Sequence, residues 1–365
     1  IRDRDTAQEM WRNNYEESAM FTSDDLAAAK RNGKWGFVNR NGKEICPFKY
    51  DKVLPFLLGS ALVKVGNYWG VIDVNGKELV PTYYDQVFYF SNHLAKVVKN
   101  GKSGFVNKKG EVVIPLIYDD AHPFMKTITS AKRDGKAGYI NIRGKEVIPF
   151  EYEESMPFFE TLGAVKKDGK WGFITTKNEW AIQPMYDEVE SFLQGTAKAM
   201  TKDCWGLINE KNEWLIRPEY EDLARFSEGY AAVMRDELWG YVNTDNQLIC
   251  ELQYDEAMDF TEGFAAVNKD GKWTFINTEA KEIATPAYDE VRSFCHGRAA
   301  VCLDGLWGFI DAKGNQILVP RFDEVTDFEE GKIAFGLLDE EMYVVLPDGK
   351  VMTTEEFKQF TTNKM

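Results

Sequence analysis

Short apolar runs separated by turn-forming residues recur along the chain and predict strands. In residues 164–174, a β-prone run is followed by Asp168-Gly169 and then by a second run, a pattern typical of a β-hairpin. A third run, such as Glu111–Ile114, follows another turn, and we expect it to end at Pro115 because proline cannot donate to a ladder. An amphipathic helix of about 12 residues does not fit between turns this close. The pattern therefore predicts three-stranded meanders joined by connectors with room for a short fourth strand.

The meander repeats with a period of 34 residues. An aromatic residue stands 15 residues after the position of a recurrent tryptophan, an acidic residue follows it, and a Phe comes six residues after the aromatic. A tenth, eroded unit begins near Glu341. Helical repeat arrays can share this period, but the closely spaced turns favour strands. The tryptophans are Trp35, Trp69, Trp171, Trp205, Trp239, Trp273 and Trp307.

The recurrent Trp-Gly pair has a structural interpretation. Burying a large apolar side chain contributes roughly 1.5 to 3 kcal/mol, and stacked repeats bury what a single repeat cannot. We expect the glycine to remove a Cβ that would clash with a neighbouring ring or backbone. The alternative is a row of exposed tryptophans that stack on sugars or bases, which would leave the other aromatic residues short of packing partners.

The acidic residue of each repeat invites interpretation as a calcium ligand or a catalytic group. Catalysis requires carboxylates in different environments, whereas these positions are equivalent. Calcium-binding β-rolls carry a Gly-Gly-x-Gly-x-Asp pattern that is absent from this sequence. We therefore expect turn residues that accept backbone N–H bonds in an Asx-type role. They are Asp51, Asp85, Asp119, Glu153, Asp187, Glu221, Asp255, Asp289 and Asp323.

Together these residues resemble the bacterial WG-repeat family. The segment 34–39 (Lys-Trp-Gly-Phe-Val-Asn), Pro47, Tyr50-Asp51 and Phe56 match its pattern, and the resemblance covers about residues 24 to 346. It implies a repetitive β architecture, occurrence in bacterial and often envelope-associated proteins, and no general catalytic site. The sequence departs from the pattern at Ser103 and Ala137 in place of Trp, at Thr274 in place of Gly, and at Cys250-Glu251-Leu252, where most units have a proline.

The expected fold is all-β, with the repeats of residues 24–346 stacked as an open solenoid or superhelix. A closed β-propeller-like ring is the alternative, although nine or ten blades would exceed the usual four to eight. Residues 1–23 are predicted to form an N-terminal helical cap because Met10, Trp11 and Tyr15 have helical spacing. Residues 347–365 are predicted to form a C-terminal helical cap, which Thr353 and Glu356 would open as a capping box.

Composition narrows the possible partners and compartments. The 365 residues are 44% hydrophobic and carry a formal charge of −15, which allows a large core and opposes nucleic-acid binding. No apolar run reaches the roughly 18 residues of a membrane span. The chain starts at Ile1, so the sequence leaves open whether a leader was removed. We expect no cofactor or metal. The resemblance favours the cell envelope, periplasmic or surface-associated, whereas an odd number of unpaired cysteines favours the cytoplasm. The five, interpreted as buried thiols, are Cys46, Cys204, Cys250, Cys295 and Cys302.

Departures from the repeat pattern are the candidate binding residues, since shared residues hold a repeat scaffold together. The departures cluster in units two to four, about residues 90 to 165, although drift in a stable array would produce the same cluster. A recurrent Gly is replaced by His93, Thr127 and Thr161. Small or apolar residues are replaced by Lys96, Thr129 and Ser130, and Trp is replaced by Ser103 and Ala137. The histidines His93, His122 and His296 are interpreted as surface or rim residues.

The sequence thus favours a non-catalytic interaction scaffold that binds a protein, peptide or glycan. Its acidic surface would suit a basic partner. One alternative is a hydrolase of envelope carbohydrate, which requires two unequal carboxylates about 5 to 10 Å apart in a cleft. The other is an architectural spacer, which would lack an exposed aromatic patch.

Overall fold

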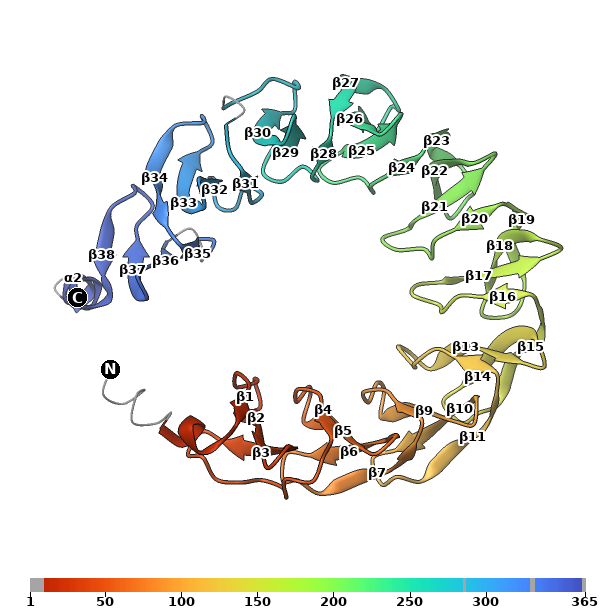
Figure 1. The fold of residues 1–365 in the computed structure, drawn as a ribbon. Coiled ribbons are helices and arrows are strands. Elements are labelled where there is room, and N and C mark those ends of the chain that lie inside the picture. Colours follow the sequence, from red (N-terminus) through yellow and green to blue (C-terminus); the bar gives the residue numbers. More distant parts are fainter. Residues whose placement is uncertain (1–9, 285–286, 329–331, 363–365) are drawn as a thin grey trace. The chain divides into compact units, whose positions relative to one another are not determined.

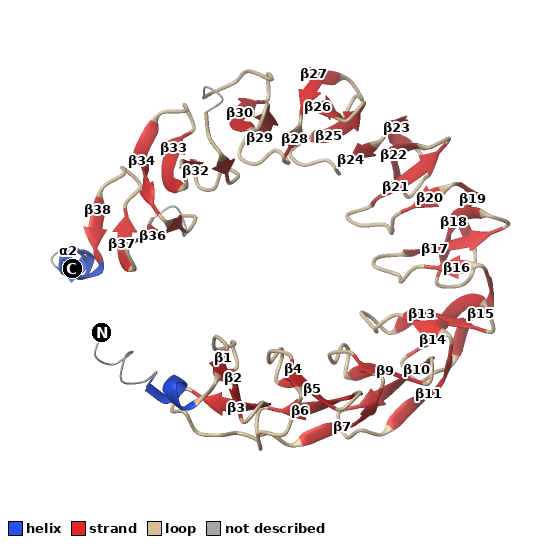
Figure 2. Cartoon of the chain, viewed as in Figure 1, coloured by secondary structure: helices blue, strands red, loops and turns tan. Residues whose placement is uncertain are grey.

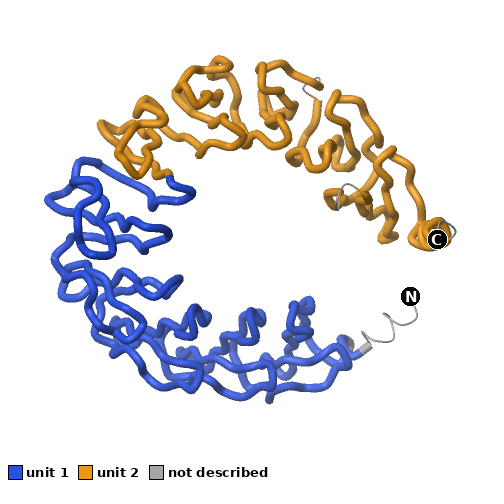
Figure 3. Tube along the Cα trace, turned by 180° about the vertical axis from the view of Figure 1, so that it is seen from behind, with its two compact units in different colours: residues 1–195 blue, residues 196–365 orange. Residues whose placement is uncertain are grey.

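The computed structural model describes residues 10–284, 287–328 and 332–362. This part of the chain forms ten successive antiparallel sheets, with a short helical segment near each end (Figures 1 and 2). The chain divides into two compact units, residues 1–195 and 196–365 (Figure 3). The fold is therefore all-β and tandemly repeated, as the sequence predicts.

The first unit holds five sheets in chain order. They are β1 (Glu17–Ser18), β2 (Leu26–Arg31) and β3 (Lys34–Asn39); β4 (Lys52–Val53), β5 (Ser60–Val65), β6 (Tyr68–Asp73) and β7 (Glu78–Tyr84); β8 (Gln86–Val87), β9 (Leu94–Lys99), β10 (Lys102–Asn107) and β11 (Val112–Tyr118); β12 (Asp120–Ala121), β13 (Ile128–Arg133), β14 (Lys136–Asn141) and β15 (Glu146–Tyr152); and β16 (Glu154–Ser155), β17 (Leu162–Lys167), β18 (Lys170–Thr175) and β19 (Trp180–Tyr186).

The second unit continues the same pattern. Its sheets are β20 (Glu188–Val189), β21 (Thr196–Thr201), β22 (Cys204–Asn209) and β23 (Trp214–Tyr220); β24 (Asp222–Leu223), β25 (Tyr230–Arg235), β26 (Leu238–Asn243) and β27 (Leu248–Tyr254); β28 (Glu256–Ala257), β29 (Phe264–Lys269) and β30 (Lys272–Asn277); β31 (Glu290–Val291), β32 (Arg298–Leu303), β33 (Leu306–Asp311) and β34 (Gln316–Phe322); and β35 (Glu324–Val325), β36 (Ala334–Leu338), β37 (Glu341–Val345) and β38 (Val351–Thr353). Strand β20 belongs to the first sheet of this group, although its residues fall within the range of the first unit.

The central hairpin of each sheet follows the predicted turn. Strands β17 and β18 pair in register from Leu162↔Thr175 to Lys167↔Lys170. The two turn residues between them, Asp168 and Gly169, have φ angles of 52° and 75°. Two left-handed residues define the type I′ turn, whose twist matches that of the strands it joins.

One detail of the sheets differs from the prediction, and another agrees with it. Strand β11 does not end at Pro115 but runs through it to Tyr118. This is possible because β11 is the edge strand of its sheet, where a missing N–H costs no ladder bond. The connector contributes a fourth strand of two residues, such as β12, which pairs with β13 at the opposite edge.

The core of the array lies between successive repeats. The connector Phe of one repeat packs on the aromatic residue two positions after Trp in the preceding sheet: ring centroids are 4.8 Å apart for Phe105 and Phe124, and 4.7 Å apart for Phe173 and Phe192. Both rings of each pair are fully buried. Trp171 is 3% exposed, and the recurrent tryptophans of the other repeats are buried or half-buried. The recurrent aromatics are therefore packing residues, as expected.

The recurrent acidic residue accepts backbone N–H bonds, but its role is not the predicted Asx-type turn. Asp119 Oδ2 accepts from the N–H of Gly135 at 2.9 Å, across the sheet and 16 residues along the chain. The local Asx role belongs to the residue four positions after Trp: Asn141 Oδ1 accepts from Arg143 N and Lys145 N. Equivalent long-range bonds are made by Asp51, Asp85, Glu153, Glu221, Asp255, Asp289 and Asp323.

Helical segments occur near both ends of the described chain. Segment η1 (Met10–Asn14) is a 3-10 helix, and buried Trp11 packs on Ala27, Ala29 and Val38 of the first sheet. Residues 1–9 of the predicted N-terminal cap lie outside the described residues. At the other end, helix α2 (Thr354–Thr362) follows β38, and Thr353 and Glu356 exchange the two hydrogen bonds of the predicted capping box. None of the described helices has the length and apolar character required to cross a membrane.

Candidate functional site

The eight departures from the repeat pattern lie in different settings. Ser130 and Ala137 border a hollow between the fourth and fifth sheets, and Lys96 and Thr129 belong to the polar network beside it. His93, Thr127 and Thr161 are exposed on the loops that precede the central hairpins, whereas Ser103 is buried in β10. The structure thus brings part of the predicted set together and leaves the loop residues outside the hollow.

The hollow has a volume of about 190 Å³ and lies entirely within the first unit. Strands β12, β13 and β14 of the fourth sheet form most of its wall, and β16 of the fifth sheet closes one side. Its lining residues are Asp120, Ala121, His122, Ser130, Ala131, Lys132, Ala137, Glu154 and Ser155.

The hollow exists where the repeat lacks its tryptophan. Ala137 pairs with Lys132 in the fourth sheet, and Trp171 pairs with Lys166 in the fifth sheet at the equivalent register. Because side chains alternate between the two faces of a strand, Ala137 presents a methyl group on the face where Trp171 presents its indole. A methyl group cannot fill the volume of an indole, and the neighbouring strands do not close over the difference.

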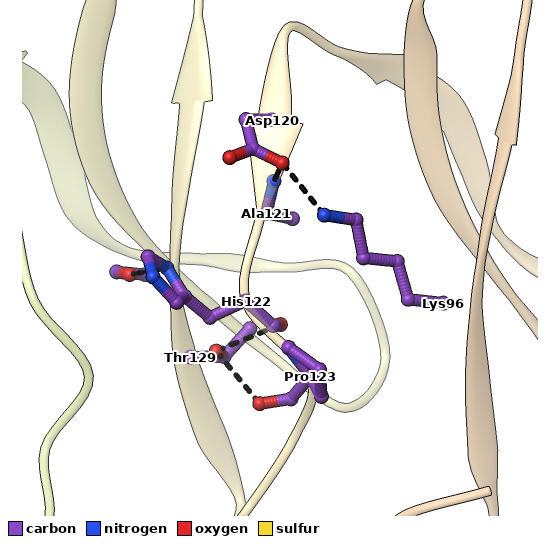
Figure 4. A network of polar contacts seen from close by, with 7 residues as sticks. Lys96, Asp120, Ala121, His122, Pro123 and Thr129 are labelled. Carbon is purple, nitrogen blue, oxygen red and sulfur yellow. Dashed lines mark hydrogen bonds and ion pairs between the residues drawn. The ribbon is translucent and has the colours of Figure 1, made fainter. Parts of the chain in front are cut away.

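An ion pair joins the third and fourth sheets at the edge of the hollow (Figure 4). Lys96 Nζ donates to Asp120 Oδ1 at 2.6 Å, and the N–H of Ala121 donates to the same oxygen at 2.8 Å. Lys96 is only 8% exposed. Burial raises the pKa of Asp120, but the hydrogen bonds from Lys96 and Ala121 outweigh it and hold the pKa below its usual value. Asp120 is therefore a fixed anion at neutral pH.

A second part of the network holds His122. Ser130 Oγ and His122 Nδ1 share a hydrogen bond of 2.7 Å. Thr129 Oγ1 donates to the His122 carbonyl at 3.0 Å (Figure 4). Burial lowers the pKa of His122, Lys96 acts in the same direction, and Asp120 opposes both. The imidazole is therefore mainly neutral at pH 7, with one ring nitrogen committed to Ser130.

The lining can bind a small group that has an apolar body and a polar edge. Ala121, Ala131 and Ala137 supply apolar surface, while hydroxyl, carboxylate and ammonium groups stand around them. Two carboxylates, Asp120 and Glu154, line the same hollow, and Glu154 also lies 3.7 Å from Lys166 Nζ. The site thus offers both hydrogen-bond donors and acceptors.

Sequence reasoning did not identify several of these residues. His122 is exposed, as expected of a surface or rim residue, but its place in the lining of the hollow was not predicted. Asp120, Lys132, Glu154 and Ser155 were not candidates. Comparison at the 34-residue period gives no signal for His122, because that position varies between apolar and polar residues, as in Leu54, Glu190, Arg292 and Thr326. Lys132 gives no signal either, since lysine recurs at its position in other repeats.

The cysteines of the described residues form no disulfide bonds. All five are free thiols in the described residues; Cys46 and Cys302 are buried, and Cys204, Cys250 and Cys295 are half-buried. Burial raises the pKa of the Cys46 thiol. The expectation of buried thiols is therefore correct for two of the five.

Comparison with protein families gives a clear assignment. The family described as "WG containing repeat" matches nine segments, namely residues 35–69, 69–102, 104–126, 138–171, 171–203, 205–239, 239–273, 273–307 and 307–337. These segments span most of the chain, so the protein belongs to the WG-repeat family, as its sequence resemblance indicates.

Other comparisons show only distant similarity. No curated protein matches the sequence significantly. A crystal structure of a eukaryotic initiation factor has 10% identity and a TM-score of 0.43, and the match covers 80% of this chain and 95% of that one. Hsv2p of Kluyveromyces lactis has 8% identity and a TM-score of 0.30, over 81% and 95% of the two chains. The extracellular domain of a putative hybrid two-component system from B. thetaiotaomicron has 8% identity and a TM-score of 0.27, over 94% and 59%.

Proposed function

We propose that this WG-repeat protein is a non-catalytic interaction scaffold that binds a peptide segment of a protein partner at the hollow between its fourth and fifth sheets. One observation carries the proposal: the repeat in which Ala137 replaces the tryptophan has a lined hollow of about 190 Å³. In the other repeats, the recurrent aromatic residues pack in the core, and recurrent acidic residues such as Asp51 and Asp85 accept backbone N–H bonds. At the hollow, polar side chains border open volume.

The lining favours a peptide over a glycan. Sugar recognition commonly relies on an exposed aromatic face, and none of the described residues that line the hollow is Phe, Tyr or Trp. A peptide side chain would enter the hollow, while its flanking backbone would meet Ser155 and the Lys132 ammonium at the wall. Asp120 and Glu154, together with the formal charge of −15, favour a partner segment with basic residues beside the inserted side chain.

Selection from a random peptide library against the purified protein tests this proposal. We expect enriched peptides to bind with micromolar affinity and to lose at least tenfold in affinity when Ala137→Trp fills the hollow. Val98→Lys in the third sheet, at the position equivalent to Lys132, is a surface-charge control that should not change binding. Failure to enrich any peptide, or equal binding by Ala137→Trp, would contradict the proposal.

A second candidate function is hydrolysis, because Asp120, Glu154 and the Ser130–His122 pair share one hollow. A general acid needs a raised pKa, whereas the pKa of Asp120 is lowered and its oxygen is already bound by Lys96. Ser130 is 1% exposed, which leaves its hydroxyl little access to a substrate. Turnover of a chromogenic glycoside or ester that disappears in Asp120→Asn and Glu154→Gln would establish this function in place of binding.

A further inference from the structure

We propose that the hollow is a socket for one aromatic ring, preferably an indole, that occupies the place where seven other repeats hold their own tryptophan. The identity of the ring's carrier, a partner peptide, rests on the proposed function. Binding of the ring itself does not depend on that function and can be measured separately.

The first argument is the lysine that faces the missing ring. The residue paired with the repeat tryptophan is a lysine in three other repeats: Lys30 with Trp35, Lys64 with Trp69 and Lys166 with Trp171. The ammonium nitrogens lie 5.6, 5.7 and 5.8 Å from the ring centroids, within the range of a cation–π contact. In the fourth sheet the equivalent lysine, Lys132, pairs with Ala137 and lines the hollow.

The second argument is the fit of volume and polarity. An apolar protein cavity of about 150 Å³ accommodates benzene, so a hollow of about 190 Å³ has room for a single ring system. The Nε1 of Trp171 has no hydrogen-bond partner among the described residues. At the hollow, by contrast, Ser155 stands where the next repeat has Val189, and the carboxylate of Glu154 is adjacent. These groups can accept a hydrogen bond from an indole N–H.

The third argument is the contrast with the other repeat that lacks tryptophan. In the third sheet Ser103 pairs with Val98, so no lysine faces the empty position. Lys96, which corresponds to Ser130 by the repeat period, extends to Asp120 of the next sheet. Loss of the tryptophan therefore does not by itself produce the socket, which also needs Lys132 and the short Ser130 side chain.

Isothermal titration with N-acetyl-tryptophanamide, and with N-acetyl-leucinamide as the aliphatic comparison, tests the inference on the full chain. We expect millimolar or tighter binding of the tryptophan probe and at least tenfold weaker binding of the leucine probe. Ala137→Trp should remove binding by supplying the ring internally. Lys132→Gln should weaken it severalfold, whereas Lys64→Gln, which removes a lysine over Trp69 far along the sequence, should leave it unchanged.

The inference is wrong if both probes bind equally, if neither binds, or if Ala137→Trp still binds the tryptophan probe. Should Ala137→Trp fail to fold, Ser130→Lys provides the second test, because it copies the third-sheet arrangement and should close the hollow. The two proposals fail separately. Selected peptides that bind without an aromatic residue would contradict the ring socket and support the scaffold. Binding of the tryptophan probe without any selected peptide would support the ring socket and contradict the scaffold.

Discussion

In most repeats, the backbone of the neighbouring strand requires the glycine that follows the recurrent tryptophan position. A Cβ built on Gly172 would lie 2.6 Å from Ile182 O, and one on Gly308 would lie 2.3 Å from Leu318 O. Thr274, the one residue that replaces this glycine, bonds through its hydroxyl to Ala284 O, and its described sheet has three strands. The absence of a side chain at this position therefore permits the third strand to pair closely.

Substitution of Gly172 by alanine should separate β18 from β19. We expect a loss of roughly 3 kcal/mol in the free energy of unfolding, at the upper end for overpacking, together with faster amide exchange in β19. Gly169→Ala is the matched control because its added Cβ would meet no atom within 4 Å, although its φ of 75° is left-handed. That variant should lose stability while β19 stays protected. Unchanged exchange of β19 in Gly172→Ala would refute the explanation.

Among the candidate binding residues, His93 adopts a left-handed backbone conformation that lowers the stability of the fold. It has a φ of 67°, at a turn position where Gly195 has 71° and Gly229 has 85°. A left-handed conformation costs a side-chain-bearing residue about 1 to 2 kcal/mol. His93→Gly should therefore raise the free energy of unfolding by about 1 kcal/mol in a denaturant titration. Thr127→Gly should give no gain, because Thr127 has no left-handed φ; an equal gain in both variants would contradict this interpretation.

In several repeats, charged hydrogen bonds join the central hairpin to the connector. Lys102 Nζ donates to Asp119 Oδ1 at 2.6 Å, while Asp119 Oδ2 accepts the N–H of Gly135 in the hairpin turn of the next sheet. The bond from Lys102, followed by that from Gly135, lowers the pKa of Asp119. Lys34 does the same for Asp51, and Lys272 for Asp289. These carboxylates tie successive elements together and do not form a site.

The lowered pKa of these carboxylates gives stability a definite pH dependence. A carboxyl group with a lower pKa in the folded state stabilises that state fully above its unfolded pKa, near 3.8, and loses the contribution as pH falls through the folded pKa. Asp119→Asn should therefore lower the denaturation midpoint at pH 7, and its difference from the unmodified protein should shrink below about pH 4. A difference that is the same at pH 7 and pH 3 would contradict the assigned role.

Helix α2 begins with a reciprocal cap that was predictable from four residues of sequence. Thr353 Oγ1 accepts from Glu356 N at 3.2 Å, and Glu356 accepts from Thr353 N at 2.9 Å. Thr353→Ala should destabilise the helix by about 1 kcal/mol, measured as faster amide exchange in residues 356–362. Glu355→Ala alters a neighbouring acid that takes no part in these two bonds, and it should leave the exchange nearly unchanged. Equal effects of the two substitutions would argue against the cap.

The elements were largely predictable because turn residues and apolar runs mark them locally. Asp168-Gly169 fixes its hairpin through backbone conformation alone, and the local sequence carries that information. Strand β11 was predicted too short, because the effect of Pro115 depends on whether the strand lies at an edge or in the centre of its sheet. The partner of Asp119 was also missed, since that bond depends on how the connector strand β12 pairs with β13.

For the whole molecule, the period identifies the family and the number of sheets but not the hollow. Ser130 and Ala137 were recognisable as departures from the pattern. Lys132 was not, because it matches the repeat pattern and becomes a lining residue only when the neighbouring Trp is absent. Glu154 belongs to the next repeat and joins the site through packing between sheets. A binding site made from a missing side chain therefore requires the register of two successive repeats.

Hydrogen–deuterium exchange of the protein with and without a selected peptide tests the location of the binding site most directly. We predict that the peptide slows exchange in residues 120–122, 130–132 and 154–155, which line the hollow. Residues 164–166 and 188–189 are the equivalent segments of the following repeat and serve as the internal comparison. Their exchange should be unaffected because Trp171 fills that interface. Protection confined to other repeats, or spread equally over all of them, would contradict the account.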